Sequence, residues 1–300
     1  MSRLKLKPEV IASLAVMFAT MFVQTSNASN MCSTEATRIR FSNIQLNTGV
    51  RLHYAEQGER GGPVVLMLHG FTDSWFSYSR VLKSMDPKYH VYVLDQRGHG
   101  DSDQPRNGYT PRVLADDVLA FMNAIGINEA TVVGHSMGSF VAQHIATLEP
   151  ERVKKLVLIG SAPSVKNTAV YGLQRDINAL SDSVPEKFVR DFQVGLLVQP
   201  VPDDFINSII AESRRLPARI WKEVIKDLLT GADAELAKIK SPTLIVWGRE
   251  DGLVPLSEGE RFHKDIAGST MIVFDQCAHV PNIEKAGEFN AAVIKFLGAQ

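Results

Sequence analysis

The stretch that decides the fold is Gly134-His135-Ser136-Met137-Gly138, which fits the pattern G-x-S-x-G. The apolar run at residues 130–133 predicts a short buried strand before it, and apolar side chains at helical spacing predict a helix over residues 136–149. A serine at such a corner sits on a strained turn that exposes its hydroxyl, and the flanking glycines leave room for backbone and substrate. The pattern alone also fits a glycine-rich turn with an incidental serine, so the rest of the chain decides whether Ser136 is a nucleophile.

Other apolar runs alternate with helical patterns along the chain. Residues 50–56 alternate in polarity, and continuous apolar runs occupy Val64–Leu68, 91–94, Val153–Ile159, 244–247 and 271–274. Continuous runs suit strands that are covered on both faces of a parallel sheet. Helical patterns at residues 114–125 and 283–297 separate or follow these runs. This order predicts an α/β domain with a mostly parallel sheet.

The alternation stops between residues 162 and 238. This segment has no strand-like run, and its residues 184–197, 203–216 and 219–229 read as helices punctuated by prolines. We therefore expect a core domain made of residues 37–161 and 239–300, with a helical cap at 162–238. Helices inserted there would cover the carboxyl edge of the sheet, where ligands bind in open α/β folds.

The first 28 residues differ from all that follows. Arg3, Lys5 and Lys7 precede an uncharged apolar run at residues 10–23, and Ser26-Asn27-Ala28 supplies small residues. This is the layout of a secretory signal peptide, and we expect cleavage after Ala28 and a secreted or periplasmic mature protein. The run is too short for a comfortable membrane span, so no stable span is expected after cleavage; an uncleaved anchor is the alternative.

Composition narrows the classes of partner. The chain has 300 residues, 45% of them hydrophobic, and its formal net charge is −1, so no excess of positive charge favours nucleic acid. No repeat or basic stripe is present. The two cysteines, Cys32 and Cys277, allow one disulfide in an oxidising compartment but not a metal site. The oligomeric state stays open.

A serine nucleophile needs a base and an orienting acid. His279 follows the strand-like run Thr270–Phe274 in a short loop before the last helix, which places a base at the carboxyl edge of the sheet. Asp251 follows the run at 244–247 and is the candidate acid, whereas the neighbouring Glu250 is expected to point the other way. The order Ser136, Asp251, His279 is that of α/β-hydrolase triads.

A tetrahedral intermediate also needs donors for its oxyanion. We expect these donors to be the backbone N–H of Met137, directly after the nucleophile, and that of Phe71, in the loop after the strand Val64–Leu68. Aromatic side chains at Trp75, Phe76 and Tyr171 are candidates for lining a substrate pocket, with ordinary packing as the alternative.

These motifs together resemble the serine hydrolases of the α/β-hydrolase fold, over about residues 38–297. The resemblance rests on His69-Gly70-Phe71, residues 95–102, the Ser136 turn, residues 248–251 and Ala278-His279. It implies an eight-stranded, mostly parallel sheet flanked by helices, a helical cap between strands 6 and 7, and no metal or organic cofactor. It also implies that residues 97–102 form a structural turn, so His99 is not expected to be catalytic.

The same family contains epoxide hydrolases and haloalkane dehalogenases, which carry an aspartate nucleophile. Ser136 argues against both activities. We expect a serine hydrolase that cleaves carboxylic esters of small molecules through an acyl-serine intermediate. The alternatives are a cofactor-free haloperoxidase-like perhydrolase, a lactonase or a C–C bond hydrolase on the same triad, and a non-catalytic protein that binds a small ligand.

Overall fold

The computed structural model describes residues 37–299. The predicted signal segment at 1–28 and Cys32 lie outside this range, while Cys277 is buried and carries a free thiol. No helix within the described range has both the length and the apolarity that crossing a bilayer requires.

One eight-stranded sheet organises the described residues, in the spatial order β1-β2-β4-β3-β5-β6-β7-β8. The strands are β1 Arg40–Gln45, β2 Arg51–Gln57, β3 Val64–Leu68, β4 His90–Leu94, β5 Ala130–His135, β6 Val153–Ile159, β7 Thr243–Gly248 and β8 Thr270–Phe274. The strand β2 runs antiparallel to both β1 and β4, and all other neighbouring pairs are parallel. The mostly parallel eight-stranded sheet is therefore confirmed.

The strand β1 was not predicted as a strand from its own residues. Its side chains alternate between exposed and half-buried, because it pairs only with β2 at the edge of the sheet. Such a strand lacks the continuous apolar run that marks the central strands.

The central strands bury both faces against helices. Leu66 and Leu68 point to one face, into a core shared with α3 and α4, while Val65 and Met67 point to the other, into a core shared with α2 and α11. Adjacent side chains of a strand point to opposite faces, so each central strand feeds two cores. This arrangement explains why these strands read as unbroken apolar runs.

Helices connect the strands and extend beyond the predicted set. They are α2 Ser79–Leu82, α3 Pro111–Ala124, α4 Met137–Leu148, α5 Thr168–Asn178, α6 Glu186–Gly195, α7 Asp203–Arg214, α8 Ala218–Thr230, α9 Leu256–Asp265, α10 Pro281–Glu284 and α11 Ala286–Gly298. The helices α5 and α9 were not predicted; the buried residues are Val170 and Ile177 in α5 and Gly259 and Phe262 in α9. The predicted last helix is broken at Lys285, which has a non-helical backbone.

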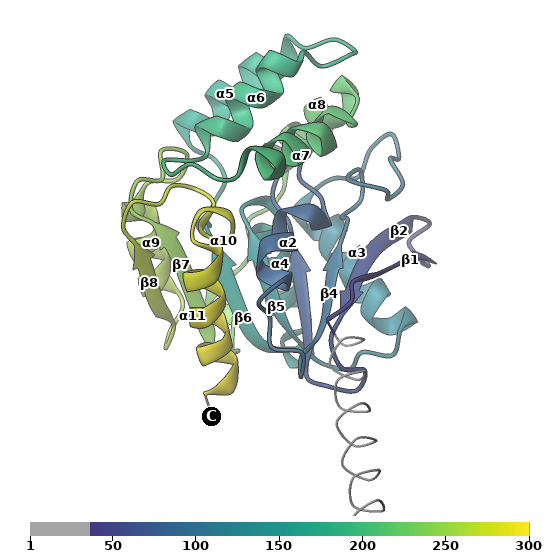
Figure 1. Cartoon of the computed structure of the whole chain (residues 1–300), viewed down its shortest axis with the longest axis vertical. Helices are drawn as coiled ribbons and strands as arrows, with labels where there is room; N and C mark the ends of the chain where they lie inside the picture. The colour runs from purple at the N-terminus through teal and green to yellow at the C-terminus, as the bar shows by residue number, and fades with distance from the viewer. Residues whose placement is uncertain (1–36, 300) are drawn as a thin grey trace, which may run out of the picture. The chain divides into compact units, whose positions relative to one another are not determined.

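Four helices, α5 to α8, lie between β6 and β7 in the chain and sit above the carboxyl edge of the sheet (Figure 1). They occupy the segment where the sequence places the cap. Trp221 of α8 is fully buried there, and its ring packs edge-on against Phe71 of the core and against Phe188 and Phe192 of α6. This aromatic group joins the cap helices to the loop that follows β3.

A buried ion pair fixes the turn after β4. Arg97 donates two hydrogen bonds to Asp117 of α3, at 2.7 and 2.8 Å, and Thr48 donates a third to the same carboxylate. Both partners of the ion pair are almost fully buried. A buried pair with this two-pronged geometry is destabilising to break, because the remaining charge loses its partner.

We predict that Asp117→Asn lowers the free energy of unfolding by about 3–5 kcal/mol, because it leaves Arg97 as a buried and uncompensated charge. The neighbouring Asp116→Asn is the matched control, since Asp116 pairs with Arg112 at an exposed position of the same helix and such pairs contribute about 0–1 kcal/mol. Urea unfolding followed by circular dichroism measures both. Equal losses in the two variants would contradict the prediction.

Candidate active site

Ser136 occupies the corner between β5 and α4, as the sequence predicts. Its backbone adopts φ 50°, in the left-handed region that non-glycine residues avoid. Two close approaches hold this corner: a Cβ at position 134 would lie 2.3 Å from the carbonyl oxygen of Gly138, and one at position 138 would lie 2.3 Å from that of Leu68. Both positions therefore require glycine. A residue held in so unusual a conformation is typical of a functional site.

The structure brings the three predicted triad residues together from separate loops. The Nε2 atom of His279 lies 2.9 Å from the Oγ of Ser136, and its Nδ1 lies 2.8 Å from the Oδ2 of Asp251. Asp251 follows β7 and His279 follows β8, so the loops at the carboxyl ends of two neighbouring parallel strands supply the acid and the base. The rival acid, Glu250, instead accepts a hydrogen bond from the N–H of Cys277.

The surroundings of Asp251 keep its carboxyl ionised. Burial alone would raise the pKa of Asp251, but the charge and hydrogen bond of His279 and the N–H groups of Val254 and Leu253 outweigh burial and lower it. An ionised carboxylate only accepts hydrogen bonds, so the Nδ1 of His279 carries the proton and Nε2 is free to accept one from Ser136. This is the tautomer that a serine nucleophile needs.

Two backbone N–H groups are available for an oxyanion. Those of Phe71 and Met137 both belong to residues that line the pocket at Ser136. Neither donates to another group among residues 37–299, although the N–H of Gly138 donates to the carbonyl of His69 at 3.1 Å. That last bond holds the start of α4 against the loop after β3, which brings the two free donors to the same site.

The pocket beside Ser136 is mainly apolar. Core loops, the start of α4 and the cap helices all contribute to its walls, which are formed by Gly70, Phe71, Asp73, His135, Ser136, Met137, Phe140, Val165, Val170, Leu173, Phe192, Leu196, Ile225, Leu228, Leu253 and His279. No lysine or arginine is among these residues. The pocket thus offers an apolar wall to a substrate and no positive side chain to pair with an anionic group.

The three aromatic residues predicted to line the pocket do not line it. Trp75 and Phe76 lie in a short 3₁₀ turn and border a separate surface groove, where Phe76 stacks on Phe205 of α7 and Trp75 packs against Phe41. Tyr171 is 44% exposed on the outer side of α5. The prediction for Tyr171 was wrong because α5 turns Val170 and Leu173, not Tyr171, toward the pocket. The aromatic walls come instead from Phe71, Phe140 and Phe192.

The sequence analysis missed an acidic group in the pocket, Asp73. It is 4% exposed, and burial raises its pKa to about 7 against the lowering effects of a hydrogen bond from Gln193 and the charge of His279. Its Oδ1 accepts a hydrogen bond from Gln193 Nε2 at 3.1 Å. One feature of the sequence could have indicated Asp73: it is a carboxylate two residues after the expected oxyanion donor Phe71, in the same loop.

Other buried histidines near the site stay neutral. Burial lowers the pKa of His135 to about 3, with the charge of His279 adding to the effect, and burial likewise lowers that of His99 to about 3. The Nε2–H of His135 donates to the carbonyl of His279 at 3.0 Å and so holds the base loop. His99 contacts the carbonyl of Arg97 and does not line the pocket, as expected for a structural turn.

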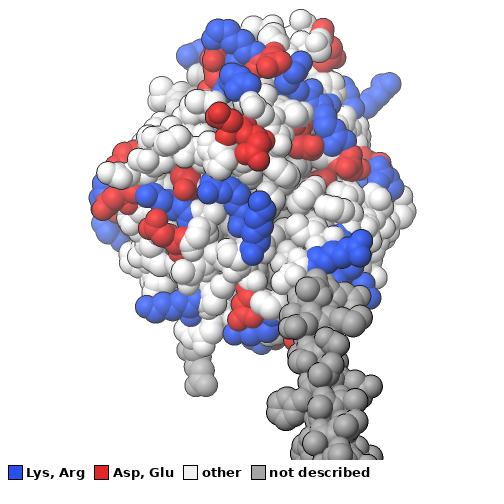
Figure 2. All heavy atoms as spheres, viewed as in Figure 1, with Lys and Arg blue, Asp and Glu red and all other residues white. Residues whose placement is uncertain are grey.

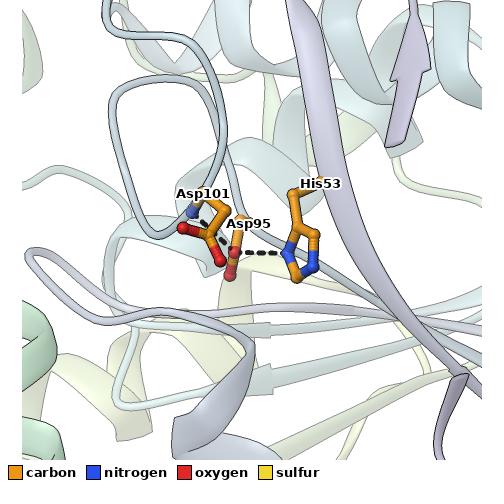
Figure 3. A group of neighbouring side chains, drawn as sticks. All are labelled: His53, Asp95 and Asp101. Atoms are coloured by element: carbon orange, nitrogen blue, oxygen red, sulfur yellow. Dashed lines mark hydrogen bonds and ion pairs between the residues drawn. The ribbon is translucent and has the colours of Figure 1, made fainter. Parts of the chain in front are cut away.

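Within residues 37–299, one cluster of possible metal ligands lies away from this site, at His53, Asp95 and Asp101 (Figure 3). The Oδ2 of Asp95 accepts hydrogen bonds from His53 Nδ1 at 2.7 Å and from the Asp101 N–H at 3.0 Å, while its Oδ1 accepts one from the Trp75 N–H at 2.7 Å. The Asp101 carboxylate pairs with Arg215. Protein groups thus satisfy the cluster, and these bonds hold the turn at residues 95–102 against β2.

The model of the alpha/beta hydrolase fold family matches residues 63–286. The chain belongs to the α/β-hydrolase fold family. As a member of that family, whose curated relatives are named hydrolases, it is a hydrolytic enzyme. The family match runs from just before β3 to the start of α11 and so includes the loops that carry Phe71, Ser136, Asp251 and His279.

Curated relatives of this α/β hydrolase include two C–C bond hydrolases. A 2-hydroxy-6-oxononadienedioate/2-hydroxy-6-oxononatrienedioate hydrolase of Pseudomonas putida is 30% identical over 91% of this chain and 99% of its own length. A 2-hydroxy-6-oxo-6-phenylhexa-2,4-dienoate hydrolase of Comamonas testosteroni is 30% identical over 82% of this chain and 91% of its own.

Solved structures similar to this α/β hydrolase confirm its fold. An esterase of Exiguobacterium antarcticum superposes with a TM-score of 0.78 at 23% identity, covering 86% of this chain and 99% of that one. An enol-lactonase of Burkholderia xenovorans LB400 superposes with a TM-score of 0.76 at 21% identity, covering 86% and 100%. At these identities the likeness concerns the fold.

The raised pKa of Asp73 predicts a pH-dependent stability. Because its pKa in the folded protein, about 7, exceeds the ordinary 3.8, the folded state binds this proton more tightly than the unfolded chain. The contribution of this proton to the stability of the folded state is complete below about pH 4 and is lost as the pH rises to about 7. We predict that, because of Asp73, the free energy of unfolding of the wild type falls by up to about 4 kcal/mol between pH 4 and pH 8, and that Asp73→Asn abolishes this fall.

Urea unfolding at a series of pH values tests this prediction. The control is Asp191→Asn, which changes an exposed aspartate of α6 and is expected to leave the pH dependence of the wild type intact. If the free energy of unfolding changed with pH in the same way in the wild type and in Asp73→Asn, the raised pKa assigned to Asp73 would be contradicted.

Proposed function

We propose that this protein is a serine hydrolase that cleaves carboxylic esters with neutral, apolar acyl groups. The hydrogen-bonded chain from Ser136 through His279 to Asp251 carries the proposal, with distances of 2.9 and 2.8 Å. In this mechanism the Oγ of Ser136 attacks the acyl carbon while Nε2 of His279 takes its proton. His279 then protonates the leaving alcohol.

The remaining parts of the site have defined roles in this mechanism. The free N–H groups of Phe71 and Met137 stabilise the oxyanion of each tetrahedral intermediate, and one such donor is worth about 3 kcal/mol. Asp251 holds the imidazole in the reactive tautomer and stabilises the imidazolium. A water molecule, deprotonated by His279, hydrolyses the acyl-serine and restores the enzyme.

The lining of the pocket supports a neutral substrate. The relative from Pseudomonas putida is named for dienedioate substrates, which carry two carboxylates. Among the described residues that line the pocket at Ser136 there is no lysine or arginine, and Asp73, which also lines it, is an acid. Burying an unpaired carboxylate among apolar side chains is costly. This absence of a cation favours ester cleavage over cleavage of a dianionic dienoate.

C–C bond hydrolysis is the second candidate function, because the two curated relatives at 30% identity are named for it. The phenylhexadienoate of the Comamonas testosteroni relative carries a single carboxylate and an apolar phenyl group. It is the better C–C substrate with which to challenge the apolar pocket.

We predict that the purified protein hydrolyses p-nitrophenyl esters of short and medium acyl chains and that Ser136→Ala reduces this turnover to near background. Ser257→Ala is the control, since Ser257 is an exposed serine of α9 and does not line the pocket. The release of p-nitrophenol is measured across acyl lengths, next to the decay of 2-hydroxy-6-oxo-6-phenylhexa-2,4-dienoate. Faster turnover of the dienoate, or full activity in Ser136→Ala, would overturn the proposal.

Export is a separate proposal, supported by the basic, apolar and small-residue order of residues 1–28. We predict that the mature protein from its native host begins at Ser29, as N-terminal sequencing or intact mass would show. Replacing Ala28 by a bulky residue, Ala28→Phe, is expected to block cleavage. An intact Met1 terminus on the wild-type protein would argue for an uncleaved segment.

The charges on the surface agree with a small-molecule substrate. Basic and acidic side chains intermingle on the face drawn in Figure 2, over both the cap and the core. The formal net charge of −1 likewise supplies no general attraction to a polyanion.

A further inference from the structure

The loop that carries the oxyanion donor Phe71 is strained at its next residue. Thr72 has φ 62°, and the N–H of Asp73 closes a four-residue turn on the carbonyl of Gly70 at 3.3 Å. The third position of such a turn, when its φ is positive, is normally occupied by glycine or asparagine. A β-branched residue persists there only when its surroundings impose the conformation.

The cap supplies those surroundings through one side chain. The Nε2 of Gln193, on α6, has two hydrogens and lies within hydrogen-bond distance of three acceptors, which are Ser213 Oγ at 2.9 Å, Asp73 Oδ1 at 3.1 Å and Thr72 Oγ1 at 3.4 Å. The Oγ of Ser213, on α7, lies 3.0 Å from the carbonyl oxygen of Thr72 and 3.1 Å from that of Ile209, so its single hydrogen is shared between these two acceptors. All four residues are buried.

The residue that directly follows α6 contacts the base. The N–H of His279 donates to the carbonyl of Leu196, directly after α6, at 3.2 Å. Phe192 and Leu196 line the pocket between these two contacts. One cap helix and the residue that follows it therefore touch the oxyanion loop, the substrate wall and the base loop.

We propose that Gln193 is a positioning residue that holds the strained turn at Thr72, so that the Phe71 N–H points at the oxyanion only when the cap is seated. The inference rests on the proposed acyl-serine chemistry, because it assigns Gln193 an effect on transition-state stabilisation. Gln193 does not touch the reacting atoms. It acts through the turn, with Ser213 as the second support.

The test replaces Gln193 by a side chain of similar length that cannot donate. Gln193→Met is expected to lower kcat for p-nitrophenyl esters about 10- to 100-fold, since displacing an oxyanion donor costs up to the full effect of its loss. KM is expected to stay within about threefold. The control is Arg219→Gln, which removes another cap-to-core contact, with the carbonyls of Gln104 and Pro105, and leaves the oxyanion loop untouched.

Two further readouts separate positioning from general damage. A trifluoromethyl ketone, which forms a hemiketal oxyanion with the serine, is expected to bind Gln193→Met more weakly by the same factor as the loss in kcat/KM. Amide hydrogen exchange of a peptide covering residues 69–73 is expected to speed up in Gln193→Met and not in Arg219→Gln. The exchange readout needs no turnover, so it tests the bracing even if the protein cleaves no ester.

The possible results divide cleanly. Unchanged kcat, a rise in KM alone, unchanged inhibitor binding or unchanged hydrogen exchange would each overturn the proposal. If Gln193→Met does not fold, as judged by its thermal melt, Ser213→Ala takes its place and is expected to lower kcat about 3- to 10-fold with the same exchange signature. Absence of ester turnover in the wild type, with faster exchange in the variant, would refute the proposed function and leave the bracing role standing.

Discussion

The structure of the site depends on the close approach between the start of α4 and the end of β3. The N–H of Gly138 donates to the carbonyl of His69, and a Cβ at position 138 would fall 2.3 Å from the carbonyl oxygen of Leu68. This contact places the backbone of Met137 beside the loop that contains Phe71. It also holds Ser136 in a left-handed conformation, which the bond from its own N–H to the carbonyl of Ile159 reinforces at 2.9 Å. The geometry of the nucleophile and of its donors thus has one common cause.

Much of this arrangement is predictable from the sequence. Central strands covered on both faces leave unbroken apolar runs, and the carboxyl ends of parallel strands meet at one edge. Those two rules, together with the order of Ser136, Asp251 and His279 in the chain, were enough to predict that these three distant residues lie close together. The edge strand β1 was not predicted from its residues, because a half-exposed strand with one neighbouring strand has no continuous apolar run. Its existence followed from the resemblance to a family and not from its own residues.

The parts that escaped prediction depend on how helices of the cap are rotated. Whether Tyr171 or Val170 faces the pocket differs by one residue on α5, about 100° around the helix axis, and the sequence does not fix that rotation. Gln193 left one faint signal, a polar residue four positions after the buried Val189 on the inner face of α6. Asp73 left another, a carboxylate in the loop of an expected oxyanion donor. Each becomes meaningful only when the opposite partner is known.

The position of α6 has a consequence for how such enzymes diversify. In this fold the cap is the segment that most directly shapes the substrate wall, through residues such as Phe192 and Leu196. The same helix carries Gln193, and Leu196, directly after it, supplies the carbonyl that accepts the His279 N–H. Chimaeras that exchange whole caps between relatives would therefore alter selectivity and turnover together. A chimaera that keeps α6 of this protein and takes α5 and α8 from a relative would change selectivity without changing turnover.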